Sequence, residues 1–183
     1  MYYLREIFCF RIDWTKFEVK QVFITSKDGT QIPMFIEPKK GIVLDGSHLA
    51  LLYGYKGFNF SITPYFNIGH IIISRHLDAV FAIQKIRGGG EYGEEWKKAG
   101  SLARKQNCFD NFISVVELLL SYGYTQPKNL CIEDGSNDGF LVATCINQLM
   151  LVLWTCCIFI NLLLGMHGLM IRDLQTRKRN LID

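Results

Sequence analysis

The chain has 183 residues, of which 49% are hydrophobic and 20% are charged, with a formal net charge of +3. This composition excludes a disordered chain and supplies enough apolar residues for one domain with a buried core. The small net charge, without a run of Lys and Arg among aromatic residues, argues against nucleic acid as a partner.

The cysteines and the first residues of the chain indicate the cellular compartment. Six cysteines lie at positions 9, 108, 131, 145, 156 and 157; none forms a CxxC pair, and no histidine has ligand spacing from two of them. The sequence therefore predicts no metal. The opening MYYLREIFCFRIDW contains Arg5 and Glu6 and lacks a long apolar core, unlike a secretory signal. We therefore expect reduced cysteines and a cytoplasmic protein.

The first half of the chain predicts strands. KFEVKQVFITSKDGTQIPMFIEPKK (16–40) has two β-rich runs on either side of Asp28-Gly29, which indicates a hairpin. HLALLYGY (48–55) predicts a buried strand that ends in glycine. HIIISRHLDAVFAIQKIRGGG (70–90) predicts one or two strands, the second ending in a glycine run.

The second half predicts helices that alternate with strands. The pattern turns helical from Glu94 to about Cys108, and residues 109–124 have apolar side chains at helical spacing. NLCIED (129–134) predicts a strand, followed by a turn and then a helix over Asn137–Asn147. Strands that alternate with helices indicate an α/β fold with a mostly parallel sheet.

The character of the sequence changes after Gln148. Residues 149–171 carry no charged side chain, and Arg172, Arg177, Lys178 and Arg179 follow them. As a helix this segment would measure about 34 Å, enough to cross the hydrocarbon core of a bilayer. Two interpretations remain open: a single membrane span with a positive flank, or a buried hydrophobic helix of an incomplete domain.

The run RGGGEYG formally matches a dinucleotide fingerprint. Gly88-x-Gly90-x-x-Gly93 follows a predicted strand, and Asp110 lies downstream. Glu94 and Glu95 come next, however, and their carboxylates would repel a pyrophosphate at the start of the helix. The alternative is a tight glycine turn that closes a strand.

Two further motifs carry candidate site residues. In LYGYKGF (52–58), the Tyr55 hydroxyl could donate to a developing oxyanion; alternatively, Tyr55 and Phe58 are core aromatics beside a turn. In EDGSNDGF (133–140), Ser136 has the strand–turn–helix setting of a nucleophile elbow, with the Asn137 backbone N–H as an oxyanion donor. The alternative is a turn serine or a helix N-cap.

Five segments occur in an order that is typical of one family: SKDGTQIPMFI, DGSHLALLYGYKGFNFSITP, IRGGGEYGEEWKKAG, KQNCFDNF and GSNDGFLVATCINQ. Over about residues 20–148, the chain resembles the catalytic domain of the prolyl oligopeptidase (prolyl endopeptidase) family. The resemblance implies an α/β-hydrolase fold, a Ser-Asp-His triad and no cofactor. It also implies cleavage of short peptides after proline, behind a β-propeller that screens access.

The resemblance assigns roles residue by residue. Ser136 corresponds to the nucleophile, and the Tyr55 hydroxyl and the Asn137 backbone N–H correspond to the oxyanion donors. Phe58 falls where the family lines its proline pocket. RGGGEYG corresponds to a structural signature near the site rather than to a nucleotide cradle.

The departures from the family pattern shape the expected domain organisation. Lys56, Asp134 and Asp138 stand where the family has glycine, and the triad Asp and His belong to sequence beyond the elbow that has no counterpart here. The propeller is absent too. We expect a partial α/β-hydrolase domain over 1–148 and a hydrophobic helix with a basic tail over 149–183.

Three functional hypotheses follow. The first is a serine peptidase by descent that is inactive as an isolated chain, since His48, His70, His76 and His167 do not fit the general base. The second is a non-catalytic truncated isoform that binds a partner. The third is a form of either that is tethered to a membrane through 149–171.

Overall fold

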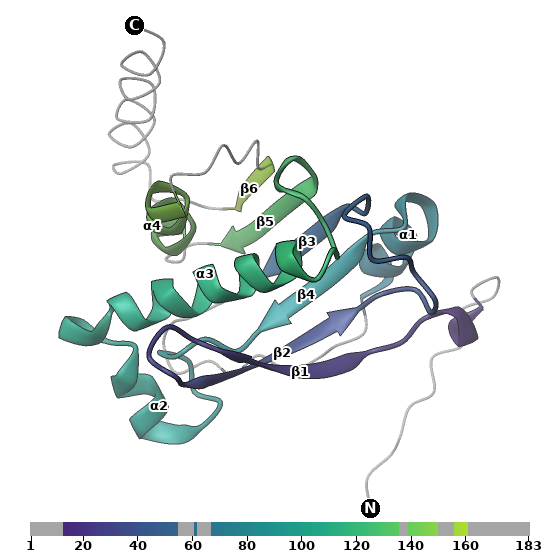
Figure 1. Ribbon diagram of the computed structural model, residues 1–183. Coiled ribbons are helices and arrows are strands. Elements are labelled where there is room, and N and C mark those ends of the chain that lie inside the picture. The colour runs from purple at the N-terminus through teal and green to yellow at the C-terminus, as the bar shows by residue number, and fades with distance from the viewer. Residues whose placement is uncertain (1–12, 55–60, 62–66, 136–138, 150–155, 161–183) are drawn as a thin grey trace, which may run out of the picture.

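The computed structural model describes residues 13–54, 61, 67–135, 139–149 and 156–160, which form a six-stranded sheet flanked by helices (Figure 1). The strands are β1 (Lys20–Thr25), β2 (Gln31–Glu37), β3 (Ala50–Tyr53), β4 (Val80–Gln84), β5 (Leu130–Gly135) and β6 (Cys156–Ile160). The helices are α1 (Ile68–Leu77), α2 (Gly93–Ala99), α3 (Gln106–Ser121) and α4 (Gly139–Leu149). Short 3-10 turns lie at Trp14–Lys16, Leu102–Arg104 and Pro127–Asn129.

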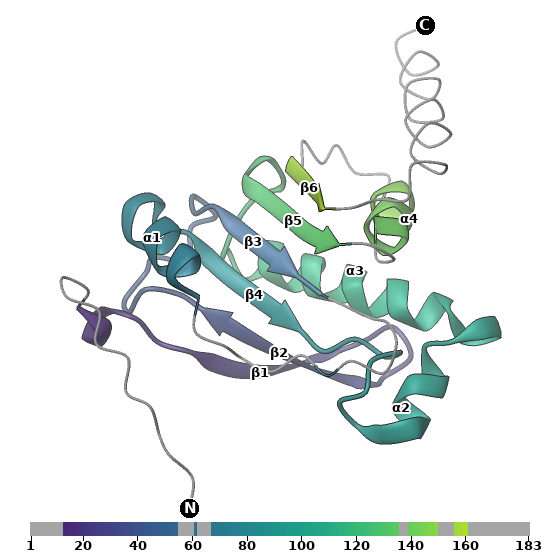
Figure 2. The same cartoon turned by 180° about the vertical axis from the view of Figure 1, so that it is seen from behind.

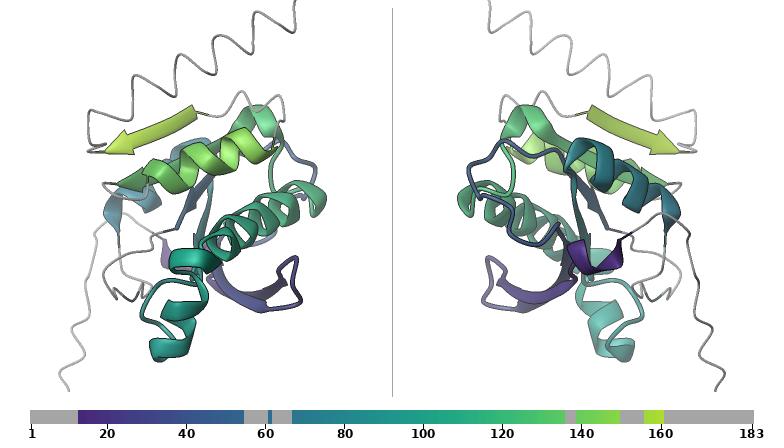
Figure 3. Two further views of the ribbon diagram at one scale, coloured as in Figure 1. Left: turned by 90° about the vertical axis from the view of Figure 1, so that its left-hand side faces the viewer. Right: turned by 90° about the vertical axis from the view of Figure 1, so that its right-hand side faces the viewer.

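The sheet is mixed, with the strand order β1-β2-β4-β3-β5-β6. β1 pairs antiparallel with β2, and β2 pairs antiparallel with β4. The other neighbours, from β4 through β3 and β5 to β6, are parallel. The predicted α/β class is confirmed, and the parallel part is confined to β3–β6. β1 and β2 are antiparallel because a short hairpin can join only antiparallel strands. Figure 3 shows α1 and α3 on opposite sides of the strands.

The predicted hairpin around Asp28-Gly29 is confirmed. The Ser26 N–H donates to the Thr30 carbonyl, and the Gly29 N–H donates to the Ser26 carbonyl. Gly29 has a φ of +85°, which glycine adopts without the steric cost that a side chain would add. The Asp28 carboxylate accepts from the Thr30 N–H at 3.1 Å and so closes the turn.

The strand prediction for the first part of 70–90 is wrong, because this part is the helix α1 and only β4 is a strand. Asn67 caps the helix, since its side-chain oxygen accepts from the Gly69 N–H at 2.8 Å. Asp78, in the left-handed conformation with a φ of 51°, ends it. The run of isoleucines favours a strand locally, but a crossover between the parallel strands β3 and β4 requires a connection that packs on the sheet.

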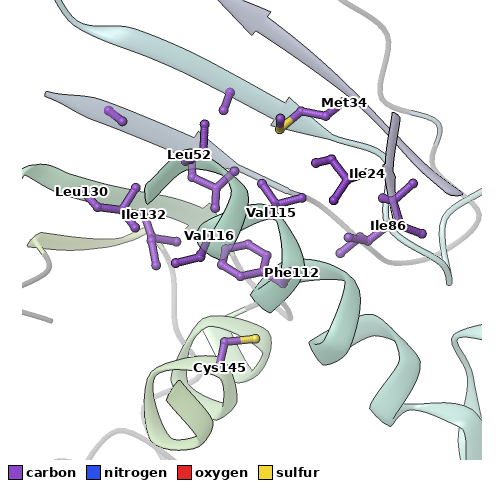
Figure 4. Packing of buried hydrophobic residues seen from close by; sticks show 14 of the residues in the cluster. Ile24, Met34, Leu52, Ile86, Phe112, Val115, Val116, Leu130, Ile132 and Cys145 are labelled. Carbon is purple, nitrogen blue, oxygen red and sulfur yellow. The ribbon is translucent and has the colours of Figure 1, made fainter. Parts of the chain in front are cut away.

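The core lies between α3 and one face of the sheet (Figure 4). The predicted helical spacing over 109–124 is confirmed, with the helix bounds shifted to Gln106–Ser121. Four of its apolar side chains are fully buried: Phe112, Val115, Val116 and Leu119. They pack in one cluster with Met34, Leu52, Leu130 and Ile132 from the strands and with Leu141 and Cys145 from α4.

The helical prediction for Glu94–Cys108 is confirmed in part. The helix α2 ends at Ala99, a 3-10 turn follows at Leu102–Arg104, and α3 begins at Gln106. The predicted helix after the elbow corresponds to α4, whose described residues begin at Gly139. Residues 137 and 138 lie outside the described part of the chain.

A strand replaces part of the helix that we expected over 149–171. Cys156–Ile160 forms β6, which pairs parallel with β5 from Cys131↔Cys156 to Gly135↔Ile160. The open edge of β5 supplies backbone hydrogen-bonding groups, and a run of β-branched and aromatic residues suits a strand there. Among the described residues no helix has the length and apolar character needed to cross a membrane. Residues 150–155 and 161–171 lie outside them.

Replacing Phe112 with alanine should destabilise the fold by about 3–5 kcal/mol, because the fully buried ring would leave a cavity beneath α3. Urea unfolding followed by circular dichroism measures the loss. The matched control is Tyr122→Ala at the end of the same helix, where the ring is 63% exposed and the change should stay within about 0.5 kcal/mol. Equal effects of the two substitutions would contradict this placement of the core.

Candidate functional site

Three parallel strands bring their carboxyl ends to one edge of the sheet. β3 lies between β4 and β5, and its last residue, Tyr53, is in register with Ile83 of β4 and with Glu133 of β5. The arrowheads of the three strands accordingly point the same way in Figure 2. Ligands of open α/β sheets bind beyond the carboxyl ends of the strands. This edge is therefore the candidate site.

The predicted nucleophile elbow has the flanks that such a motif requires. β5 ends at Gly135 and α4 begins at Gly139, so only three residues separate the strand from the helix. Ser136 and Asn137 are two of those three, and both lie outside the described residues. The strand and the helix of the predicted elbow are confirmed, and the roles of the two residues stay predictions.

The predicted oxyanion tyrosine follows the neighbouring strand. β3 ends at Tyr53, Gly54 follows it, and Tyr55 comes next in the chain. Tyr55 and Phe58 lie outside the described residues, so their roles also stay predictions. The register nevertheless means that the two segments that carry Tyr55 and Ser136 leave adjacent strands at the same edge.

A buried amide that the sequence analysis did not single out lies at this edge. Gln84, the last residue of β4, is fully buried, and neither its Nε2 nor its Oε1 has a hydrogen-bond partner among the described residues. A Cβ at Gly54 would lie 2.6 Å from Gln84 Nε2 and 2.8 Å from its Cγ, so a side chain at position 54 would displace this amide. A glutamine that ends the otherwise apolar strand VFAIQ was the available signal in the sequence.

The glycine run after β4 is held by a buried arginine. The Arg87 guanidinium donates to the carboxylate of Asp28 at 2.5 Å and to the Thr30 hydroxyl at 3.2 Å. Its Nε and its backbone N–H both donate to the side-chain oxygen of Asn111 on α3. Asn111 in turn donates to the Ser26 hydroxyl at 2.7 Å. Arg87 thus joins the β1–β2 hairpin, the end of β4 and α3.

The backbone of the glycine run and of the residues just before it packs against α2 and the start of α3. A Cβ at Gly100 would lie 2.3 Å from the carbonyl atoms of Arg87, so the end of α2 touches the run directly. The Cys108 thiol contacts the carbonyl oxygens of Arg87 and Gly100, each at 2.9 Å. The Trp96 indole donates to the Ile86 carbonyl at 3.1 Å. These contacts favour a structural turn over a nucleotide cradle for RGGGEYG.

The described histidines lie near the opposite edge of the sheet. His48 precedes β3 by two residues, and its ring lies 3.0 Å from the Val43 carbonyl. His70 stacks on Phe81, the second residue of β4, with ring centroids 4.0 Å apart. His76 is in the last turn of α1. None of the three thus lies beside the end of β5. Within the described part of the chain, no three His, Cys, Asp or Glu side chains could hold a metal ion.

Comparison with known proteins points to one family. A family model described as "Prolyl oligopeptidase family" matches residues 64–160, and its match thus includes β6. The chain is 45% identical over 132 residues to prolyl oligopeptidase A of Galerina marginata and 46% identical over 134 residues to the prolyl endopeptidase of Dictyostelium discoideum. Each alignment covers 72% of this chain and 18% of the relative.

Solved structures give the same result. The post-proline cleaving enzyme of Rickettsia typhi superposes with a TM-score of 0.70 at 37% identity, over 76% of this chain and 20% of that one. Prolyl oligopeptidase B of Galerina marginata superposes with a TM-score of 0.69 at 43% identity, over 74% and 19%. The architecture described above is therefore part of the catalytic domain of these enzymes, and the chain spans about a fifth of their length.

Replacing Gln84 with methionine should stabilise the fold by about 1–2 kcal/mol, because an apolar side chain of similar size removes a buried amide that has no hydrogen-bond partner among the described residues. The urea midpoint measures the change. Gln31→Met is the control, since that amide lies on the exposed side of β2 and donates to the Thr25 hydroxyl at 2.9 Å. A loss of stability in Gln84→Met would mean that the amide is hydrogen-bonded, contrary to this account.

The contact between Asp28 and Arg87 should make the free energy of unfolding depend on pH in the acidic range. The pKa of Asp28 falls from its ordinary 3.8 to about 2, chiefly because Arg87 donates to its carboxylate. A carboxyl group whose pKa is lowered by folding stabilises the protein above its unfolded pKa, and this contribution is lost as the pH falls from about 4 to about 2. Asp28→Asn should therefore destabilise the protein at pH 6 and have a shrinking effect below pH 4.

Unfolding by urea between pH 2 and pH 6 checks this expectation. The control is Glu95→Gln, because the Glu95 side chain is 88% exposed and lies 3.6 Å from Lys98. An effect of Asp28→Asn that is the same at all of these pH values would contradict the assigned pairing.

Proposed function

Since this chain belongs to the prolyl oligopeptidase family, we propose that it contributes the nucleophile-bearing part of a serine-type endopeptidase site for short proline-containing peptides. In this proposal Ser136 is the nucleophile, the Tyr55 hydroxyl and the Asn137 N–H stabilise the oxyanion, and Phe58 contacts the proline side chain. In this proposal the acid–base partners come from outside the described residues, and the 183 residues alone are inactive. We also propose a cytoplasmic location, from the cysteine usage.

One observation carries the proposal: β3 and β5 are adjacent and parallel, in register at Tyr53↔Glu133. Tyr55 is two residues past this pair on one strand, and Ser136 is three residues past it on the other. Neighbouring parallel strands lie about 4.8 Å apart, so the two segments leave the sheet within reach of one peptide carbonyl. An attacking hydroxyl and an oxyanion donor must face the same carbonyl, and adjacent parallel strands are compatible with that requirement.

The proposed chemistry has one part that Ser136 and the oxyanion donors would carry and another that needs a general base. The serine oxygen attacks the carbonyl after proline, and negative charge builds on the carbonyl oxygen, where the hydrogen-bond donors stabilise it. The serine proton must pass to a base. The described histidines lie towards the amino ends of the strands, whereas Ser136 follows the carboxyl end of β5 in the chain. The base is therefore supplied from outside the described residues.

Two aspartates at the predicted elbow should lower the rate of acyl transfer. Asp134 and Asp138 flank Ser136 at two residues on either side. A carboxylate near the reacting carbonyl opposes the growing negative charge, which lowers the rate even when a base is present. We therefore expect slower acyl transfer at this site than in relatives that have glycine at the two positions.

A fluorophosphonate probe with imidazole as an external base tests the proposal. In buffer alone, the chain should label at the same background rate as its Ser136→Ala variant. Molar imidazole should raise the labelling of the wild-type chain by about tenfold, because a general base contributes at least that much, and should leave Ser136→Ala unchanged. Tyr55→Phe should lose most of the rescue, since one oxyanion donor is removed.

Two outcomes would contradict the proposal. Labelling in buffer that disappears in Ser136→Ala would mean that the chain already contains a base. Labelling that never depends on Ser136, with or without imidazole, would mean that the elbow has no reactive serine. Intact mass and the circular dichroism spectrum of each variant serve as controls for folding.

A further inference from the structure

The helix α1 packs on the sheet through polar side chains as well as apolar ones. His70, in its first turn, stacks on the ring of Phe81 in β4, with ring centroids 4.0 Å apart and an angle of 11° between the planes. Ser74, one turn further on, is the one buried residue of the helix, and Ile71 is half-buried. The other large apolar side chains of the helix are exposed: Ile68, Ile72, Ile73 and Leu77. The attachment of α1 therefore depends strongly on its polar contacts.

A carboxylate lies beside the stacked imidazole. Glu37, the last residue of β2, is in register with Phe81, so the two residues are neighbours on the face of the sheet that α1 covers. The Nδ1 atom of His70 lies 3.8 Å from a carboxylate oxygen of Glu37, and the two side chains are 14% and 21% exposed. This distance is too long for a hydrogen bond, so the attraction between the two groups depends on the charge of the imidazole.

Protonation of the imidazole would turn this contact into an ion pair. Histidine side chains take up a proton in the mildly acidic range, where carboxylates are still ionised. The cationic ring would then have the Glu37 carboxylate at its edge and the face of the Phe81 ring against its own face. Both neighbours stabilise a positive charge, and together they offset the loss of water around a largely buried cation.

A second polar contact holds the other end of α1 and does not depend on a histidine. Lys39, two residues past Glu37, donates to the Arg75 carbonyl at 3.1 Å and pairs with the carboxylate of Asp78, which ends the helix. The pKa of Asp78 is lowered, chiefly because Lys39 donates to its carboxylate. This carboxylate therefore stays ionised between about pH 5.5 and about pH 8, and the contact is present over the whole range.

We propose that Glu37 and His70 form a proton-dependent attachment of α1 to the sheet. The ion pair forms when the imidazole is protonated, and it strengthens the packing of the helix on β2 and β4. When the imidazole is neutral, the attraction to Glu37 is lost and the stacking on Phe81 is kept. Because α1 is the crossover between the parallel strands β3 and β4, the pH then sets how firmly this crossover is held. The inference does not depend on whether Ser136 is reactive.

Hydrogen–deuterium exchange of the full 183-residue chain, followed by mass spectrometry, tests the proposal. Exchange of peptides that cover Ile68–Leu77 is measured at about pH 5.5 and at about pH 8 and divided by the intrinsic exchange rate at each pH, which gives the frequency of helix opening. Opening in the wild-type chain should be about three- to tenfold rarer at the lower pH, because the ion pair then holds the closed helix.

Two variants remove the pair from either side. Glu37→Gln and His70→Gln each delete one of the two charges, so each should make the opening frequencies at the two pH values equal to within about twofold. The double variant should show no further change in pH dependence, because the two charges act as one pair. Circular dichroism spectra check that each variant is folded. If His70→Gln does not fold, Glu37→Gln, which keeps the stacked ring, carries the test alone.

His76→Gln and His48→Gln are the matched controls, because each removes a histidine outside the pair. His76 is exposed in the last turn of α1, and His48 lies before β3 within electrostatic reach of Asp78. Both variants should keep the pH dependence of the wild type. Opening of α1 in the wild type that is as frequent at the lower pH, or more frequent, would overturn the proposal. A pH dependence that survives in Glu37→Gln, or that disappears in either control, would overturn it too.

Discussion

The buried guanidinium of Arg87 is the contact on which the rest of the arrangement depends. Its bonds to Asp28, Thr30 and Asn111 tie the antiparallel hairpin to α3 and to the carboxyl end of β4. A buried charge is tolerated only when such partners neutralise and hydrogen-bond it, so the three elements must assemble together. With β4 fixed, β3 and β5 line up beside it, and the candidate site follows from that alignment.

The sequence pattern correctly predicted those elements whose local conformational preference agrees with their place in the fold. Asp28-Gly29 has the turn conformation that its sequence favours, and the apolar spacing of α3 matches its buried face. The isoleucines of α1 misled the prediction because Ile68, Ile72 and Ile73 are exposed, whereas prediction from periodicity assumes that the apolar side chains of a helix face the core. β6 was missed because a long run without charged residues is compatible with either a helix or a strand. The pairing with the edge strand β5 selects the strand at Cys156–Ile160.

The sequence predicted which segments of the chain form the candidate site, but not the side-chain contacts around it. The segments after β3 and β5 carry Tyr55 and Ser136, which the sequence pattern and the family resemblance singled out as candidates. Gln84 beneath Gly54 and the pairing of Asp28 with Arg87 depend on register between strands that are distant in sequence, which no local pattern encodes.

Photo-crosslinking from position 55 tests most directly whether Tyr55 and Ser136 meet at one edge of the sheet. Tyr55 is replaced by benzoylphenylalanine, the folded chain is irradiated, and the crosslinked peptides are identified by tandem mass spectrometry. The account predicts crosslinks to the segment between Glu133 and Gly139, because β3 and β5 are parallel neighbours. Crosslinks confined to other segments would contradict the shared edge and, with it, the proposed site.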